Sequence, residues 1–432
     1  MKTNKTLLST AVAFGLLSSA NLANAAGFQL AEYSATGLGR AYAGEAAMAD
    51  NASAQWRNPA MLTYLEGTQV SVGAIYVNPN IDIDGNVNFA GKNISASSDD
   101  FAHDAIIPNF YLSHQYNEKI AIGFALGTNY GMETDLGKDF AASHFGNEAS
   151  VISKEANLNL AYQLNEQFSI GGSVRYIIAE GSFGATAPKT NILNLPQGTT
   201  LKYMEGDDTA WGWQVGSAWQ INENHRVGFT YKSEVELKLE GHAEGVGFGL
   251  GTPIIPKSRD NGYMYLTLPA TAELASFHQL TEKLAMHASF NWTDWSSFEK
   301  LEAHMETAGT QMVKEEHWED NYRFAVGATY QLQPKLALRT GIAYDTSAVS
   351  DKNRTITIPE TDRTWLSVGA TYDWTQNFTL DAGFTYIIAK DAPIKESRGY
   401  TTDQTAEDIA GQFVGETTGN VWLIGVQANY RF

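Results

Sequence analysis

The chain has 432 residues, no cysteine and a formal net charge of −19 at pH 7. Without cysteine it can form neither disulfides nor thiolate metal sites, and so acidic a surface excludes nucleic acid as a partner. No stretch approaches 18 uninterrupted apolar residues, which excludes a bundle of membrane-spanning helices.

Residues 1–25 have the features of a secretory signal peptide. Lys2 and Lys5 supply the positive charge, residues 7–20 are mostly apolar or small, and Ala23-Asn24-Ala25 fits a cleavage site. The apolar run contains Ser and Thr and is shorter than the roughly 20 residues that a membrane anchor needs. We therefore expect a mature chain that starts at Ala26, has 432 − 25 = 407 residues and, having lost only two lysines, carries 27 − 48 = −21 charges.

Residues 26–66 follow no strand pattern. The stretch is rich in Gly and Ala and has short helical possibilities around residues 41–49. Its large apolar side chains are too many for a disordered leader: Phe28, Leu30, Tyr33, Leu38, Tyr42, Met48 and Trp56. We predict that this segment folds as a plug, or hatch, for the structure that follows it.

From residue 67 to 432 the chain alternates period-two segments with two kinds of connection. The short polar connections are 117–119, 165–167, 222–225, 281–283, 333–335 and 375–377, and the long irregular ones are 81–100, 132–149, 184–206, 241–259 and 391–417. Short turns at one rim and long loops at the other are typical of outer-membrane barrels.

The period-two segments predict the fold class. We expect strands that start near 68, 104, 119, 150, 167, 208, 224, 260, 283, 315, 335, 362, 377 and 418. In most of them, one face is apolar and the other is polar or small, which suits lipid on one side and a wet interior on the other. The prediction is an all-β fold: a transmembrane antiparallel β-barrel of about 14 strands, plugged by the small N-terminal hatch.

The last strand ends at the C-terminal Phe432, after apolar residues at 422, 424, 426, 428 and 430. We expect it to close the barrel against the first strand and to be recognised by the outer-membrane assembly machinery. The acidic loops, for example Asp99, Asp100 and Asp104, are either simply solvated or hold divalent cations that bridge to outer-membrane lipid and lipopolysaccharide.

Six segments carry a resemblance to a known family. They are AGFQLAEYSATGLGRAYAGEAAMAD at the mature start, WRNPAML, TNYG, WGWQVGSAWQINENHRVGFTYKSEV, NRTITIPETDRTWLS and the terminal NYRF. The chain thereby resembles, from residue 26 to its end, the long-chain fatty acid transporters of the Gram-negative outer membrane, the FadL/TodX-like proteins. The resemblance implies a plugged 14-stranded barrel in the cell outer membrane, with no catalytic residue, cofactor or metal site. We expect a monomer.

The resemblance also assigns a hatch motif and a wall opening. The family's Asn-Pro-Ala hatch motif matches Asn58, Pro59 and Ala60, where the fixed φ of Pro suits a rigid bend. An inward kink that opens the wall matches Asn129, Tyr130 and Gly131, since Gly weakens strand pairing. From the residues alone, the first could be an ordinary turn, and Gly131 could merely end a strand.

Ligand contacts are carried over in the same way. Phe28 matches a residue that the family places against the ligand, although simple hatch packing would explain it too. Lys314 matches a basic residue that holds the fatty acid carboxylate, with a solvated lysine beside Glu315 and Glu316 as the alternative. The family's second basic position falls near Ala185, which has no charge, and Lys189 or Lys202 could substitute.

The function implied is outer-membrane uptake of long-chain fatty acids. A chain of roughly 15 methylenes prefers an apolar site to water by about 12 kcal/mol, at about 0.8 kcal/mol per CH₂, so an aqueous pore would not serve it. Capture would start among loop residues 241–259, with Phe248 and Leu250 as ligand contacts, and release would pass sideways through the wall after the hatch rearranges. The alternatives are uptake of aromatic hydrocarbons and a general diffusion porin. An enzyme is not expected, because neither GxSxG nor HExxH occurs.

Overall fold

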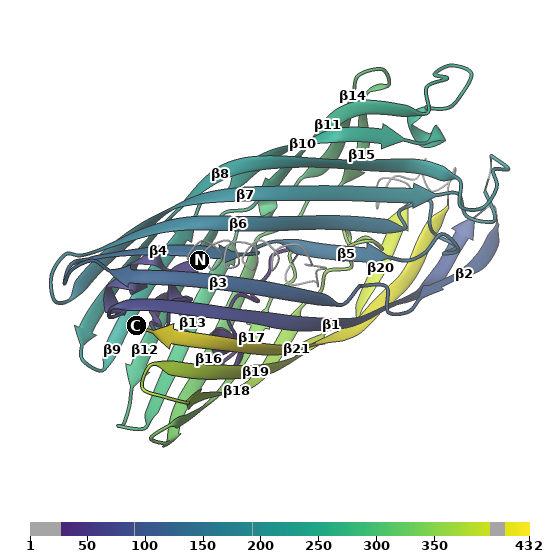
Figure 1. Ribbon diagram of the computed structural model, residues 1–432. Coiled ribbons are helices and arrows are strands. Elements are labelled where there is room, and N and C mark those ends of the chain that lie inside the picture. The colour runs from purple at the N-terminus through teal and green to yellow at the C-terminus, as the bar shows by residue number, and fades with distance from the viewer. Residues whose placement is uncertain (1–26, 90, 192, 398–410) are drawn as a thin grey trace, which may run out of the picture.

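The computed structural model describes residues 27–89, 91–191, 193–397 and 411–432, and the predicted signal peptide lies outside these ranges. Its strands form a single antiparallel sheet that closes into a barrel around the N-terminal segment (Figure 1). No helix within the described ranges is long and apolar enough to cross a membrane. The predicted all-β fold with a plugged barrel is confirmed.

The elements follow the chain in this order. The hatch contains α2 (Ala35–Leu38), η1 (Glu45–Ala47), α3 (Ala54–Arg57) and η2 (Pro59–Tyr64), where η marks a 3₁₀ helix. The first part of the sheet contains β1 (Thr68–Phe89), β2 (Lys92–Ser98), β3 (Ala105–Gln115), β4 (Ile120–Gly127), β5 (Gly131–Asp135), β6 (Glu148–Gln163), β7 (Phe168–Thr186), β8 (Thr200–Asn222), β9 (His225–Lys232) and β10 (Val235–Glu244). After η3 (Val246–Phe248) come β11 (Arg259–Leu268), β12 (Thr271–Gln279), β13 (Leu284–Thr293), η4 (Trp295–Ser297), β14 (Lys300–Met305), β15 (Gly309–Glu315), β16 (Asn321–Gln333), β17 (Leu336–Asp345), β18 (Arg363–Asp373), β19 (Phe378–Ala389), β20 (Ala392–Ser397) and β21 (Gln412–Arg431).

The last strand closes the wall against the first, as predicted. β1 and β21 pair from Gln69↔Arg431 to Asn88↔Gln412. β4 and β5, β9 and β10, and β11 and β12 each continue one another along the wall, and β2, β14, β15 and β20 lie in hairpins beyond it, so the 21 strands of the described residues make 14 spanning strands. Most strands begin within two residues of the predicted start. β8 and β21 begin six or more residues earlier, because their ends extend into hairpins beyond the rim. The strand expected near 315 begins six residues later, at Asn321, because residues 309–315 form β15, which pairs with β14.

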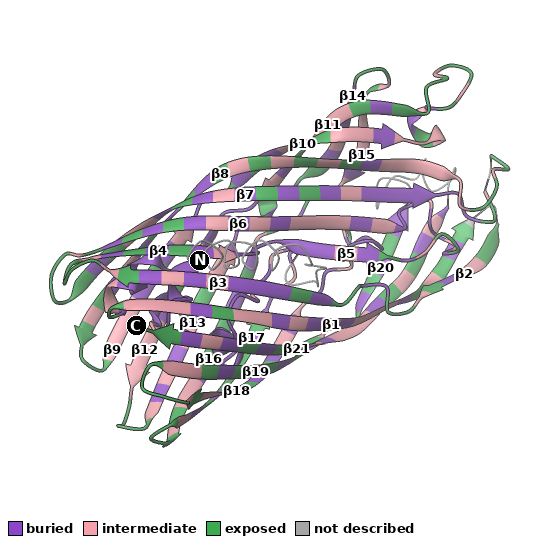
Figure 2. Ribbon diagram, in the orientation of Figure 1, coloured by how far each residue is buried: buried purple, intermediate pink, exposed green. Residues whose placement is uncertain are grey.

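The outer face of the barrel is apolar. On β16, Tyr322, Phe324 and Val326 are 39%, 52% and 49% exposed, whereas the alternating Arg323 and Ala325 are buried. Figure 2 shows the same alternation along the other wall strands. In a membrane these outward side chains face lipid, which explains why large apolar residues are on the surface.

The hatch fills the lumen near the short-turn rim and is itself almost fully buried. Asn58 anchors it, because the Asn58 side-chain amide donates to the backbone oxygens of Ala46 (2.7 Å) and of the wall residue Ser217 (3.0 Å). The Asn58 side-chain oxygen accepts from the Ala60 N–H at 3.0 Å and caps η2, with Pro59 at its first position. The three motif residues thus form a rigid corner against β8.

Two predictions about local structure were wrong. The helical segment expected around residues 41–49 is reduced to the single 3₁₀ turn of η1, because Ala41 and Tyr42 both have φ of +53° and turn the chain. Two of the connections expected as irregular loops instead contain strands: residues 81–100 extend β1 and form β2, and residues 391–417 contain β20 and the start of β21. The reason is packing: Ile83 and Val87 on β1 are buried in a small core under the long loops, together with Phe101, Phe140 and Phe413.

Gly216 on β8 gives a direct test of the hatch. A side chain there would overlap the side-chain oxygen of Asn58, so Gly216→Val should displace the hatch corner and raise ion conductance in planar bilayers above a nearly silent wild type. Ser217→Val, one residue along on the lipid side, is the matched control and should stay silent. Equal conductance of folded Gly216→Val and wild type would contradict the prediction, and Gly216→Ala serves if the larger side chain prevents folding.

Candidate ligand-binding site

An aromatic cluster surrounds Phe28 inside the barrel. The Phe28 ring lies 4.6 Å from that of Trp295, 5.8 Å from Phe298, 5.9 Å from Trp318 and 6.1 Å from Tyr130, between ring centroids. Phe28 is 1% exposed. These five residues, which we call the aromatic cluster, join the start of the hatch to Tyr130, which lies between β4 and β5, and to the segments around η4 and before β16.

The aromatic cluster continues into a larger apolar interior towards the long-loop rim. Its members come from several strands and from the segment around η3, and include Ile177, Phe183, Met204, Leu237, Leu239, Phe248, Leu250, Leu266, Leu301 and Met305. The loop residues Phe248 and Leu250 are each 1% exposed, so they pack inward and do not line an open surface groove, whereas Ile254 at the loop tip is 90% exposed. The side chains of this apolar interior therefore pack against one another and fill it.

A small cavity marks the part of this apolar interior where side chains have room to move. It has a volume of about 20 Å³ and is lined by Met204, Met264, Met305 and Leu239 among others. Methionine side chains are flexible and adapt to irregular shapes. A ligand with a long chain would therefore have to displace packed side chains to enter.

Lys314 lies at the edge of this interior and is buried, which contradicts the alternative of a solvated loop lysine. The Lys314 ammonium is 2.7 Å from a carboxylate oxygen of Glu396 on β20 and 5.9 Å from the ring centroid of Phe183. Its charge is therefore already paired. A fatty acid carboxylate would have to share Lys314 with Glu396.

Lys202 supplies a cation next to Ala185, the uncharged residue of this chain that lies near the family's second basic position. It pairs across β7 and β8 with Ala185, and its ammonium lies 5.3 Å from the centroid of the Phe248 ring. Lys189 is exposed instead. Of the two substitutes considered from the sequence, the structure brings Lys202 to the apolar interior.

The predicted kink residues lie at an interruption of the wall. β4 ends at Gly127 and β5 begins at Gly131, so Gly131 starts a strand rather than ending one. β3 pairs with β4 only from Phe110 onward, and in the described residues its other half has no ladder partner on the β5 side. Among the described residues, the wall therefore has no strand pairing between β3 and β5.

The start of the hatch fills this interruption. Leu30 donates its N–H to the Asn129 oxygen at 2.7 Å, and Gly131 donates its N–H to the Phe28 oxygen at 2.7 Å, with Gln29 opposite Tyr130. The bridge satisfies backbone groups that the kink takes out of the ladder. Phe28 thus links the aromatic cluster to the wall interruption within a single residue.

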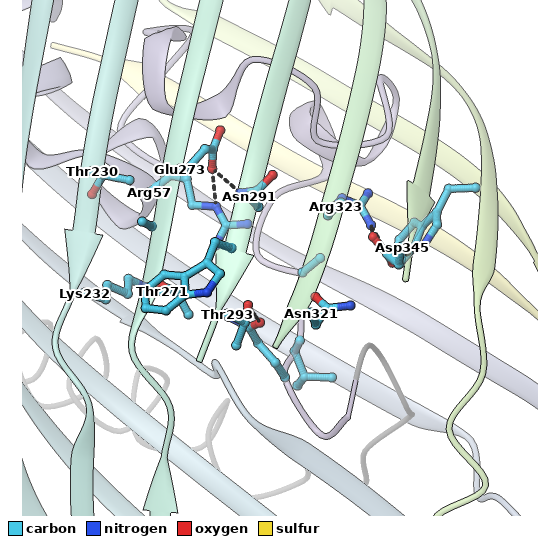
Figure 3. A pocket seen from close by; sticks show the side chains of 16 residues that line it. Arg57, Thr230, Lys232, Thr271, Glu273, Asn291, Thr293, Asn321, Arg323 and Asp345 are labelled. Atoms are coloured by element: carbon cyan, nitrogen blue, oxygen red, sulfur yellow. Dashed lines mark hydrogen bonds and ion pairs between the residues drawn. The ribbon is translucent and has the colours of Figure 1, made fainter. Parts of the chain in front are cut away.

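A polar, charged layer lies between the hatch and the wall strands β9, β12, β13 and β16 (Figure 3). Hatch residue Arg57 pairs with Glu273 at 2.9 Å, and Arg323 binds Asp345 at 2.8 Å and donates to the Ala41 oxygen at 3.0 Å. Lys232, the last residue of β9, lines the same cavity as these two ion pairs. Sequence reasoning missed Lys232, although its place in the alternation after Gly228 and Thr230 predicts an inward side chain.

The comparisons with known proteins decide the family. Residues 16–432 match the family model described as outer membrane protein transport protein (OMPP1/FadL/TodX). The chain belongs to this family. It is therefore an outer-membrane transport protein, from a family of transporters and channels rather than of enzymes.

Relatives cover the whole chain. Outer membrane protein P1 of Haemophilus influenzae is 36% identical, covering 100% of both chains, and a long-chain fatty acid transport protein of Escherichia coli is 32% identical, covering 100% of this chain and 99% of that protein. The crystal structure of a Pseudomonas aeruginosa FadL homologue has a TM-score of 0.84 at 22% identity, covering 94% and 100%. The Pseudomonas putida toluene transporter TodX has a TM-score of 0.66 at 15% identity, covering 94% and 100%. The two solved structures share the fold of this chain.

The loop carboxyl of Glu316, two residues after Lys314, predicts a pH effect. Burial raises its pKa to about 7, against the attraction of Lys314, and the Trp318 indole N–H donates to it at 3.0 Å. Because the folded pKa lies above the unfolded value of about 4.5, the group's stabilising contribution is full below pH 4.5 and is lost as the pH rises through 7. Local opening around Trp318 should be easier, by on the order of 2 kcal/mol, at pH 8.5 than at pH 5.5.

Hydrogen exchange of the amides of residues 316–318 measures this opening, after correction for the intrinsic pH dependence of exchange. Glu316→Gln, which stays neutral, should show a smaller change between the two pH values. Equal protection of the wild type at both pH values would contradict the prediction.

Proposed function

We propose that the protein takes up long-chain fatty acids across the outer membrane. Capture begins at the exposed loop tip at Ile254, and the acyl chain enters the apolar interior past Phe248 and Leu250. The carboxylate binds near Lys314 and Lys202. Release follows when the hatch segment 28–30 leaves the wall interruption at Asn129, Tyr130 and Gly131, so that the ligand passes sideways.

One observation carries this proposal: Phe28 takes part in both the aromatic cluster and the backbone bridge at the wall interruption. A chain that enters the cluster must displace or press on Phe28, and the same residue holds Gly131. Ligand binding and loosening of the bridge are therefore coupled through a single residue. The relatives named as fatty acid transporters support the ligand class.

Burial in this interior supplies the driving force for binding. At about 0.8 kcal/mol per CH₂, even half of a 15-methylene chain contributes about 6 kcal/mol, which exceeds the cost of rearranging a few packed side chains. A general diffusion porin fits less well, because the hatch is buried in the lumen. We further propose that the protein works as a monomer in lipopolysaccharide-rich membrane and is assembled through recognition of Phe432.

A second candidate is uptake of uncharged hydrocarbons such as toluene. The specific observation in its favour is the Lys314–Glu396 pair, in which the charge of Lys314 is already neutralised. The aromatic cluster would also suit an aromatic ligand. The two candidates differ in whether the cation at Lys314 is needed.

Uptake of labelled oleate and labelled toluene by cells that carry variants separates the two. Lys314→Met should lower oleate uptake at least tenfold, since a hydrogen bond to a charged group contributes about 1.5–3 kcal/mol, and should leave toluene uptake unchanged. The double variant Lys314→Met/Glu396→Gln removes both charges, which avoids an unpaired buried carboxylate.

Lys335→Met, in an exposed short turn, is the control for loss of one positive charge. Toluene uptake without oleate uptake by the wild type would contradict the fatty acid proposal and favour the second candidate.

A further inference from the structure

Lys232 is a buried cation without an acidic partner. The residue is 5% exposed, and within the described part of the chain its ammonium has no carboxylate oxygen within 4.0 Å. Its hydrogen bond goes to the side-chain oxygen of Asn129 at 3.1 Å, and the Trp56 ring lies 4.8 Å away. An ammonium group has three N–H donors, so two remain for another acceptor.

Lys232 lines a polar cavity between the hatch and the wall. The cavity has a volume of about 40 Å³, and the side chains around it converge from β9, β12, β13 and β16 (Figure 3). Thr230, Thr271, Asn291 and Thr293 supply hydroxyl and amide groups. Since one water needs roughly 10–15 Å³ of such space, the cavity has room for about three waters or for one carboxylate group, but not for an acyl chain.

The other two cations at this cavity are already neutralised. Arg57 pairs with Glu273 and Arg323 with Asp345. Lys232 is thus the only cation among the described residues lining this cavity that has no ion pair. A buried ammonium in this position favours an incoming anion, because burying a charge without a partner costs free energy.

Lys232 also acts on the wall interruption. The Asn129 side chain is held from two sides, by Lys232 and by Glu155, to which the Asn129 amide donates at 2.5 Å. Glu155 is fixed in turn by two hydrogen bonds of 2.8 Å from Arg175. An anion in the cavity would bind the two remaining donors and draw the ammonium towards it, which would lengthen the contact with Asn129 and weaken one of the two contacts that hold the kink.

The hatch segment 28–30 separates this cavity from the apolar interior. Gln29 and Leu30 line the cavity, whereas Phe28 packs in the aromatic cluster. Movement of this short segment would therefore join the two spaces. The head group of a ligand in the interior would then find Lys232 next, at the side where the wall is interrupted.

We propose that Lys232 is a second carboxylate-binding site, which accepts the fatty acid head group after Lys314 and exchanges it for the side chain of Asn129 during lateral release. The inference rests on the proposed fatty acid uptake. It adds a transfer site that acts after the first binding step, so loss of Lys232 affects uptake but not initial binding.

The test compares two ligands and two measurements. Purified protein in detergent gives the equilibrium affinity for oleate, and cells give the uptake rates of oleate and of oleyl alcohol, which has the same chain without the carboxylate. Lys232→Met should slow oleate uptake at least tenfold, change oleate affinity less than twofold and leave oleyl alcohol uptake unaltered. Lys232→Arg keeps the charge and should retain most oleate uptake, and Lys335→Met is the matched control.

Two outcomes would overturn the inference: unchanged oleate uptake by Lys232→Met, or equal slowing of oleate and oleyl alcohol, which marks a structural role of the side chain. Wild-type cells that take up no oleate would contradict the proposed function itself, and this inference with it. The wild-type measurement therefore separates the two failures.

Discussion

The structure depends on the backbone bridge between residues 28–30 and 129–131. In a membrane every backbone N–H and C=O needs a partner, which is why barrels close. β1 and β21 meet this requirement at the ends of the chain, but the wall opens between β3 and β5. The hatch supplies partners for the Asn129 oxygen and the Gly131 N–H through Leu30 and Phe28, so the plug and this part of the wall hold each other in place.

This arrangement divides the lumen into two environments. Towards the long-loop rim the interior is apolar and surrounds the aromatic cluster, and towards the short turns it is filled by paired charges that hold the hatch. Phe28 and Lys232 lie at the border between them. An amphiphile has both an apolar chain and a charged head, and such a border offers each part its own surface.

Much of the fold could be predicted from the sequence, because a period of two along each strand decides which side chains face lipid. The same logic places Lys232 inward, although it does not say what the lysine meets. The partner of Lys314 could not be predicted, since Glu396 lies on a distant strand and meets Lys314 only through the closure of the loops. The β1–β2 hairpin was missed because Asn, Asp and Gly between its apolar residues are typical of loops, while the small core that buries Ile83 and Val87 is a tertiary effect.

The central claim is that residues 28–30 must leave the wall interruption for the ligand to be released. Gln29 and Tyr130 face each other as a non-hydrogen-bonded antiparallel pair, whose Cα atoms are typically about 4.5 Å apart, within the range of a disulfide. The chain has no cysteine, so Gln29→Cys/Tyr130→Cys would contain the only two thiols. Oleate uptake by cells should fall at least tenfold when this pair is oxidised and return on reduction, with each single-cysteine variant insensitive to both treatments. Equal uptake by the oxidised and reduced forms would contradict the account.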